Sequence, residues 1–139
     1  QRYCHVYASP NNLCWSQDNR RTGLRVPSSD PAARRVENRV PGADANPYLA
    51  IAATLSAGLH GIERQLHPDL PAQGDFEVPD DLRLSCTLHR AIRRLQVSEV
   101  ARDFFTPEFI DGYLACKQLE LESFLDEISP WERRYLSQV

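Results

Sequence analysis

The sequence has 139 residues, and it contains no methionine, a single lysine and no long apolar run. No stretch approaches the roughly 20 apolar residues that a membrane-spanning helix needs. The opening residues, Gln1 to His5, lack the basic and apolar regions of a signal peptide. We therefore expect a cytoplasmic protein without membrane contact. The missing methionine and the start at Gln1 suggest a piece of a longer chain.

Metal-binding patterns of cysteine and histidine are missing as well. The cysteines have no C-x-x-C spacing and no histidine at zinc-ligand distance, which disfavours a structural zinc site and predicts free thiols. A Cys4–Cys14 bridge is the alternative. The residues concerned are Cys4, Cys14, Cys86, Cys116, His5, His60, His67 and His89.

Charge is distributed unevenly along the chain, although the formal net charge is only -3. Residues 1–45 carry seven arginines against four acidic residues, whereas residues 46–139 carry nine basic residues against fifteen acidic ones. Anion binding is therefore expected in the first part. A net acidic chain with one lysine, Lys117, does not resemble a nucleic-acid surface, so we expect no nucleic-acid partner.

The pattern of turn residues and apolar positions predicts an α+β fold. Short extended segments fill the first ~40 residues, broken by prolines and asparagines, and we expect antiparallel strands there. A helical layer follows. We therefore expect residues 1–139 to form part of one domain, with residues 1–45 strand-rich and residues 46–139 helical.

Several helices can be placed by their caps. Asn46 and Pro47 start a helix that ends at His67-Pro68, with its apolar positions on one stripe that we expect to be buried. Further helices are predicted over about 85–95, about 98–104 and from Thr106-Pro107 onward. Ser129 and Glu132 form a capping box for a terminal helix. Residues 68–82 read as an irregular loop. The stripe consists of Ile51, Leu55, Leu59, Ile62 and Leu66.

The segment Arg35-Val36-Glu37-Asn38-Arg39 carries the strongest chemical signal. In an extended strand it sets two guanidinium groups and one carboxylate on the same side. A carboxylate between two arginines stays ionised and can bind a divalent metal, while the guanidinium groups can bind carboxylate or phosphate oxygens. Without further context, the same row is an ordinary salt-bridged strand face.

The context is a run from Asp18 to Glu63 that closely resembles the C-terminal half of the glutamine synthetase family. The matching segments are Asp18-Asn19-Arg20, Gly23 to Pro27, Ala33 to Ala50, and Ala57 to Glu63. The amino-acid sequence from Asn19 to Leu24 and from Val36 to Arg39 is more similar to the γ-glutamylpolyamine synthetase branch than to the ammonia-using branch.

The resemblance implies roles for individual residues. Glu37 resembles a ligand of the metal nearer the nucleotide, which would be Mg²⁺ or Mn²⁺. Arg39 resembles the residue that contacts substrate glutamate and the migrating phosphoryl group. Arg20 and Arg25 resemble the phosphate-binding pair, with Arg20 also catalytic like Arg39, and Arg35 resembles a further arginine on the nucleotide side.

The chain also departs from the family pattern. Tyr3-Cys4-His5 stands where the family has a basic residue for the substrate carboxylate. Ala33 and Ala8 stand where the ammonia-using enzymes have a lysine and a flap glutamate, which favours a primary alkylamine over ammonium. No counterpart of the regulatory adenylylated tyrosine is visible near Asp75 to Asp81. The family's other metal ligands come from earlier segments that this sequence does not contain.

The resemblance therefore implies the C-terminal portion of an ATP-dependent glutamate–amine ligase, acting through a γ-glutamyl phosphate and inactive as an isolated piece. The family implies glutamate, ATP and an amine or ammonium as substrates, and a ring-shaped homo-oligomer. One alternative is a non-catalytic module of the same origin that binds nucleotides or other anions. A second alternative is a structural domain in which the Arg–Glu–Arg row is only an ion pair.

Overall fold

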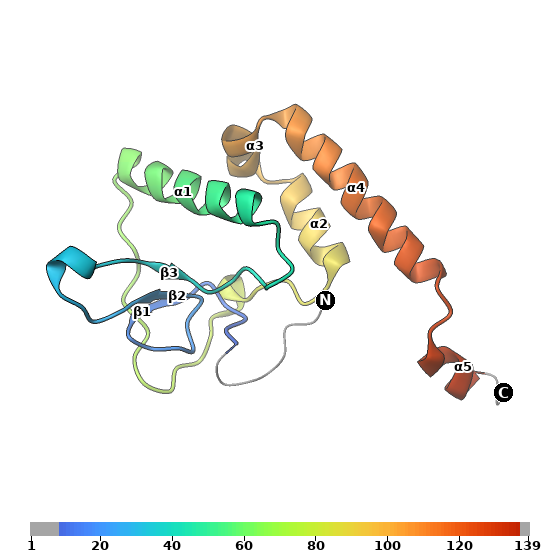
Figure 1. Ribbon diagram of the computed structural model, residues 1–139, viewed down its shortest axis with the longest axis horizontal. Helices are drawn as coiled ribbons and strands as arrows, with labels where there is room; N and C mark the ends of the chain where they lie inside the picture. The colour runs from blue at the N-terminus through green and yellow to red at the C-terminus, as the bar shows by residue number, and fades with distance from the viewer. Residues whose placement is uncertain (1–8, 137–139) are drawn as a thin grey trace. The chain divides into compact units, whose positions relative to one another are not determined.

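The computed structural model describes residues 9–136 and divides into two compact units, Gln1–Leu84 and Ser85–Val139. Figure 1 shows the sheet and the first long helix in unit 1 and the remaining helices in unit 2. The α+β class predicted from the sequence is confirmed. The sequence predicts a change from strands to helices at residues 45–46. This change falls inside unit 1 and does not coincide with the boundary between the two units.

The sheet of unit 1 has three short strands in the order β1–β2–β3. They are β1 (Trp15–Gln17), β2 (Leu24–Val26) and β3 (Glu37–Asn38), and a 3₁₀ turn, η1 (Pro31–Ala33), precedes β3. β2 and β3 are antiparallel, as expected, with Arg25 opposite Glu37. β1 and β2 are parallel, with Trp15 opposite Leu24, so the antiparallel prediction is wrong for this pair.

A turn with a polar interior explains the parallel pairing. Asp18 takes a left-handed conformation (φ 58°), which reverses the chain directly after β1. The buried hydroxyl groups of Ser16 and Thr22 lie 2.9 Å apart, and the Thr22 hydroxyl also reaches the Asn19 carbonyl oxygen at 3.0 Å. These bonds close residues 18–23 into a compact loop that returns the chain beside β1. Spacing of apolar residues carries no signal for such a loop.

Gly23 is required where this turn meets its neighbours. A Cβ at Gly23 would lie 2.0 Å from the Asn12 carbonyl oxygen. The buried Asn12 side chain accepts the Gly23 N–H at 3.2 Å and donates to the Arg21 carbonyl oxygen at 2.9 Å. Any side chain at Gly23 would force this contact apart, so the turn depends on glycine here.

The first long helix, α1 (Pro47–Glu63), begins as predicted. Asn46 accepts hydrogen bonds from the N–H groups of Tyr48 and Leu49, and Pro47 occupies the first helical position. The helix ends earlier than His67. Leu66 donates its N–H to the Gly61 carbonyl oxygen, and Gln65, at φ 52°, donates to that of Ile62. This pair of bonds is a Schellman motif, which stops a helix without proline.

The apolar stripe of α1 is exposed in the structure, so the prediction that it is buried is wrong for this chain. The five residues predicted to form it are between 59% and 75% exposed, with Leu66 lying beyond the end of the helix, and no residue of α1 is buried. α1 is linked to the sheet by a polar contact, in which the Asn38 amide donates to the Thr54 hydroxyl at 3.0 Å. The helical period predicts which residues share a face, but the period cannot supply the surface that covers them.

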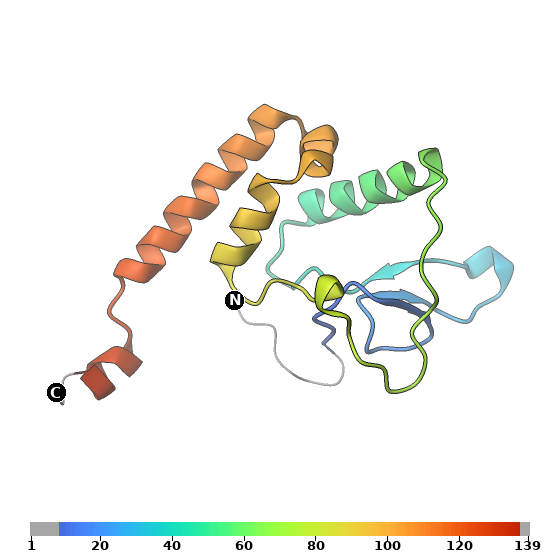
Figure 2. The same cartoon turned by 180° about the vertical axis from the view of Figure 1, so that it is seen from behind.

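Residues 68–82 form the predicted irregular loop and end in a 3₁₀ turn, η2 (Asp80–Leu82). The loop follows the β1 side of the sheet, and Figure 2 shows it in yellow-green from behind. Trp15 donates its indole N–H to the Asp69 carbonyl oxygen at 2.7 Å and accepts the Ala72 N–H at 2.9 Å. The loop is therefore tied to the sheet by hydrogen bonds.

Unit 2 consists of helices in which α4 packs on α2 and α3 (Figure 1). Ile92 and Ile110 form its buried centre, being 5% and 2% exposed. Ser98 and Thr106 cap the helices predicted to start near them, whereas the helix predicted over about 85–95 is capped by Thr87 and starts at Leu88. Ser129 and Glu132 form the capping box, with bonds of 2.7 and 3.2 Å. The helices are α2 (Leu88–Gln96), α3 (Glu99–Phe105), α4 (Pro107–Asp126) and α5 (Pro130–Leu136). Within residues 9–136, no helix combines the length and apolar character needed to cross a membrane.

Candidate functional site

The candidate site is centred on Arg25, in the middle strand of the sheet. Its Nη1 donates to Glu37 Oε2 at 2.8 Å, and its Nη2 donates to Asp18 Oδ1. The Arg25 side chain is only 16% exposed. Its Nε is buried and has no hydrogen-bond partner among the described residues. An unsatisfied buried donor is costly, so the position of Arg25 depends on the bonds of its two terminal nitrogens.

Glu37 lies between two arginines, as the row predicts for Arg35. The Arg35 Nη2 donates to Glu37 Oε1 at 3.0 Å, while Arg25 occupies the other carboxylate oxygen. Hydrogen bonds from Arg25 and then Arg35 hold the pKa of Glu37 below its ordinary value. The carboxylate is therefore ionised at neutral pH. Strand pairing explains the meeting, because Arg25 and Glu37 are opposite each other in β2 and β3.

Arg39 contacts the turn that follows β1. Its Nη1 donates to the Arg20 carbonyl oxygen, and its N–H donates to the Gly23 carbonyl oxygen at 2.8 Å. Arg39 is therefore attached to the turn that carries Arg20. The Arg20 residue itself is exposed. The structure thus joins Arg25, Arg35 and Glu37 to one another and attaches Arg39 to the main chain of Arg20, all within unit 1.

Asp18 is a site residue that sequence reasoning missed. Its carboxylate accepts from Arg25 Nη2, the nitrogen that Glu37 does not use, and this contact, followed by one with Ser28, lowers the pKa of Asp18. The available signal was its position two residues before Arg20, inside the matching Asp18-Asn19-Arg20 segment. The left-handed turn that points Asp18 toward Arg25 has no periodic signal.

A divalent metal such as Mg²⁺ or Mn²⁺ requires several oxygen ligands. An ionised carboxylate such as Glu37 is a suitable oxygen ligand for Mg²⁺ or Mn²⁺. The described residues contain no group of three or more His, Cys, Asp or Glu side chains that could bind a metal ion. Glu37 could therefore supply one ligand, and a metal bound there would need further ligands from outside the described residues.

Some predicted features fall outside the described residues. These are Tyr3-Cys4-His5, Ala8 and the Cys4 side of the alternative disulfide. Cys14, Cys86 and Cys116 do not form disulfide bonds. Cys14 is buried, and burial is the largest factor that raises the pKa of its thiol.

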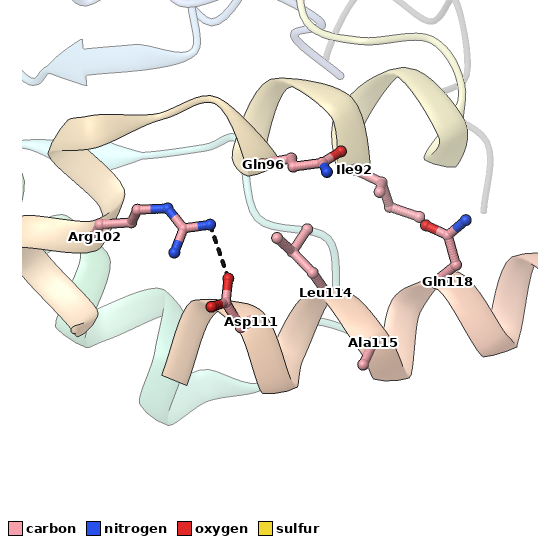
Figure 3. A pocket seen from close by; sticks show the side chains of 7 residues that line it. All are labelled: Ile92, Gln96, Arg102, Asp111, Leu114, Ala115 and Gln118. Carbon is pink, nitrogen blue, oxygen red and sulfur yellow. Dashed lines mark hydrogen bonds and ion pairs between the residues drawn. The ribbon is translucent and has the colours of Figure 1, made fainter. Parts of the chain in front are cut away.

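Unit 2 contains a separate hollow of about 260 Å³ between α2 and α4 (Figure 3). Arg102 and Asp111 lie on its wall and are paired with each other at 2.8 Å. The remaining polar lining consists of the amides of Gln96 and Gln118. None of the predicted site residues lines it. With its only charged groups neutralised by each other, this hollow has no feature that points to a ligand.

Comparison with known proteins identifies the relatives of this chain. The family model described as the catalytic domain of glutamine synthetase matches residues 1–136. The chain belongs to the glutamine synthetase family. The resemblance inferred from Asp18 to Glu63 is thereby confirmed, and it extends over nearly the whole sequence.

Curated relatives include both amine-using and glutamine-forming enzymes. The chain is 42% identical over 129 residues to a glutamate–isopropylamine ligase of a Pseudomonas species, covering 90% of this chain and 28% of the relative. It is 36% identical to the γ-glutamylethanolamide synthetase of Streptomyces coelicolor, covering 91% and 27%. It is 37% identical to the glutamine synthetase of Vibrio cholerae, covering 91% and 29%.

A solved structure, described as apo GmaS without ligand, matches the fold. The TM-score is 0.76 at 32% sequence identity, covering 92% of this chain and 30% of the other. The chain thus spans less than a third of the length of these relatives. The glutamine synthetase fold is confirmed for this part.

Proposed function

We propose that this chain is the C-terminal part of the catalytic domain of a longer, ATP-dependent ligase that joins glutamate to an amine. The observation that carries the proposal is the ionised Glu37, bound on one oxygen by Arg25 and on the other by Arg35. In a member of this family, these residues match the positions that bind metal and nucleotide phosphates. Further cationic groups come from Arg20, which lies in the neighbouring turn, and from Arg39, which donates a hydrogen bond to that turn.

A glutamate–amine ligase transfers a phosphoryl group from ATP to the γ-carboxylate of glutamate, and an amine then displaces phosphate from the γ-glutamyl phosphate. Negative charge gathers on the transferring group, so positive groups must surround it. In our proposal, Arg20 and Arg25 bind phosphate oxygens, and Arg35 lies on the nucleotide side. Arg39 contacts substrate glutamate and the migrating phosphoryl group.

Glu37 supplies one ligand for Mg²⁺ or Mn²⁺, which would neutralise phosphate charge when bound. Its lowered pKa keeps it ionised, as a metal ligand must be. The other ligands belong to the rest of the ligase. We therefore expect the 139-residue chain on its own to show no turnover with glutamate, ATP and either ammonium or a diamine.

The acceptor is proposed to be a primary alkylamine, such as a diamine or polyamine, in preference to ammonium. Ala33 and Ala8 stand where the ammonia-using enzymes have a lysine and a glutamate. Loss of a carboxylate from an ammonium pocket removes the charge that attracts the cation. Two relatives support an alkylamine as the acceptor. One is named as a glutamate–isopropylamine ligase and the other as a γ-glutamylethanolamide synthetase. In keeping with the family, we also propose a ring-shaped homo-oligomer, one catalytic domain that includes residues 1–139, and a cytoplasmic role in nitrogen metabolism.

The decisive experiment compares kcat/KM for ammonium and putrescine in the full-length ligase, with isopropylamine as a third acceptor. We expect both alkylamines to exceed ammonium. A clear preference for ammonium would instead indicate glutamine synthesis. Titration with ADP, with and without Mg²⁺, separates the remaining alternatives. Binding without turnover would favour the non-catalytic module, and absence of any metal-dependent ADP binding would favour the structural ion pair.

A further inference from the structure

Asp18 is fixed in place by contacts that do not involve the predicted site. Its main chain is in the left-handed turn at φ 58°, and its N–H donates to the Val26 carbonyl oxygen at 3.1 Å. Contacts with Arg25 and then with Ser28 hold the pKa of the Asp18 carboxyl below its ordinary value. The Asp18 main chain is therefore attached to the end of β2, the strand that carries Arg25.

Arg25 divides its donors between two carboxylates. Nη1 binds Glu37 at 2.8 Å, Nη2 binds Asp18, and the buried Nε has no partner among residues 9–136. The two carboxylates are not equivalent. Glu37 has a second cationic partner in Arg35, whereas the further contribution to the lowered pKa of Asp18 comes from the neutral Ser28.

The electrostatic environment of Arg25 should change when a metal ion binds the Glu37 carboxylate. Arg25 then loses an anionic partner and gains a like charge nearby, both of which favour a swing of its side chain out of the site. The Asp18 contact opposes that swing, because a charge-assisted hydrogen bond from an anchored carboxylate restrains the guanidinium.

We propose that Asp18 is a positioning residue, which retains Arg25 beside the nucleotide phosphates when the Glu37 carboxylate is engaged by metal. This inference rests on the proposed function. Bound to Asp18 through Nη2, Arg25 keeps Nη1 for a phosphate oxygen. Asp18 acts through Arg25 and does not itself touch the nucleotide.

An alternative role for Asp18 predicts the opposite change in nucleotide affinity. A carboxylate beside Arg25 lowers the positive potential that attracts phosphate. If neutralising Arg25 were its main effect, removing the Asp18 charge would strengthen nucleotide binding. Positioning predicts weaker binding, so one substitution separates the two roles.

The test is Asp18→Asn in the full-length ligase. Asparagine tolerates a positive φ and keeps an oxygen acceptor for Ser28, so the turn is preserved. ADP affinity is measured by calorimetry with and without Mg²⁺. We expect affinity with Mg²⁺ to fall about tenfold, the effect of losing one hydrogen bond to a charged group. Without Mg²⁺ we expect a change of less than about twofold, because Glu37 then still holds Arg25.

The Mg²⁺ dependence distinguishes positioning from a merely structural role, which would weaken ADP binding equally in both conditions. Asp80→Asn is the matched control, since Asp80 also pairs with an arginine, Arg83, but in η2. Equal or tighter ADP binding by Asp18→Asn with Mg²⁺ would overturn the inference, as would a loss that is independent of Mg²⁺. A wild-type protein without Mg²⁺-dependent ADP binding would instead overturn the proposed function, which keeps the two failures apart.

Discussion

Arg39 donates a hydrogen bond from Nη1 to the main-chain carbonyl oxygen of Arg20. The two residues are nineteen positions apart in the sequence. In the proposed ligase, one of them serves substrate glutamate and the other the phosphate groups. The bond means that the two substrate sites share a structural element, the turn formed by residues 18–23.

Arg39→Ala in the full-length ligase should lower kcat/KM for glutamate by about a hundredfold, as expected when a charged contact to substrate is lost. We also expect a smaller rise in KM for ATP, because the Arg20 carbonyl oxygen loses its partner and the turn loosens. Steady-state kinetics with each substrate varied in turn measures both effects. Arg34→Ala, at an exposed arginine next to η1, is the control. Unchanged glutamate kinetics in Arg39→Ala would refute the assignment.

Glu37→Gln should reduce kcat by about a hundredfold or more, since metal charge stabilisation is worth several kcal/mol. The variant keeps an oxygen that can accept from Arg25 or Arg35, so the sheet should remain folded. Metal affinity, measured by titration of Mn²⁺ into the full-length protein, should fall in parallel. Glu122→Gln on the exposed side of α4 is the control. Wild-type kinetics together with wild-type Mn²⁺ affinity would exclude Glu37 as a ligand.

Stability should fall on acidification because of the same carboxylate. Arg25 and Arg35 hold the pKa of Glu37 below its ordinary 4.5, so folding favours the ionised form. This contribution to stability is present above pH 4.5 and disappears as the pH falls through the lowered pKa. Acid unfolding of the metal-free protein, followed by circular dichroism, should therefore be shallower in Glu37→Gln. An identical acid transition in wild type and variant would show that the ion pairs do not contribute.

The thiols should differ in reactivity. Cys14 is 7% exposed and its pKa is raised by burial, whereas Cys86 and Cys116 are exposed. Because the thiolate is the reactive form, native protein should react with a thiol reagent first at the two exposed positions and slowly at Cys14. Peptide mapping after timed labelling measures the order. Denatured, unreduced protein should show four titratable thiols, and fewer than four would reveal a disulfide.

The loop at residues 68–82 should open more often when the Arg21 side chain is removed. Arg21 forms an ion pair with Asp75, and its guanidinium lies 5.4 Å from the centre of the Phe76 ring. Exposed contacts of these kinds contribute about 1 kcal/mol together, or roughly a fivefold change in the open population. Arg21→Ala should therefore raise amide exchange in the loop about fivefold. The charge-reversed pair, Arg21→Glu with Asp75→Lys, should restore part of the protection, and exchange that is unchanged in Arg21→Ala would refute the contact.

Local signals in the sequence were reliable where one side chain completes one structure. Asn46 caps α1, Ser129 and Glu132 form their reciprocal pair, and Arg35 reaches Glu37 from two positions away. Each of these contacts spans only a few residues, so spacing and residue type determine it. The family resemblance added the roles, which local chemistry could not supply.

The structure differs from the sequence-based predictions where backbone conformation or groups far apart in the sequence determine the fold. The parallel β1–β2 pair depends on a left-handed residue, Asp18, and on buried hydroxyl groups within the turn. The early end of α1 depends on Gln65 at a positive φ, which residue type does not indicate. The exposed stripe of α1 shows that a periodic apolar face predicts a tendency to be buried, whereas burial itself requires a partner surface.

The contacts of the long loop have a consequence for the order of folding. The strand pairs and the turn at residues 18–23 join groups that are near in sequence, so they close with little loss of chain entropy. The bond from Trp15 to Asp69 joins residues 54 positions apart. We expect the arginine-bearing turn to form early and the loop to dock on it late, after α1 has shortened the distance to be closed. The last segment to dock would also be the first to detach under denaturant.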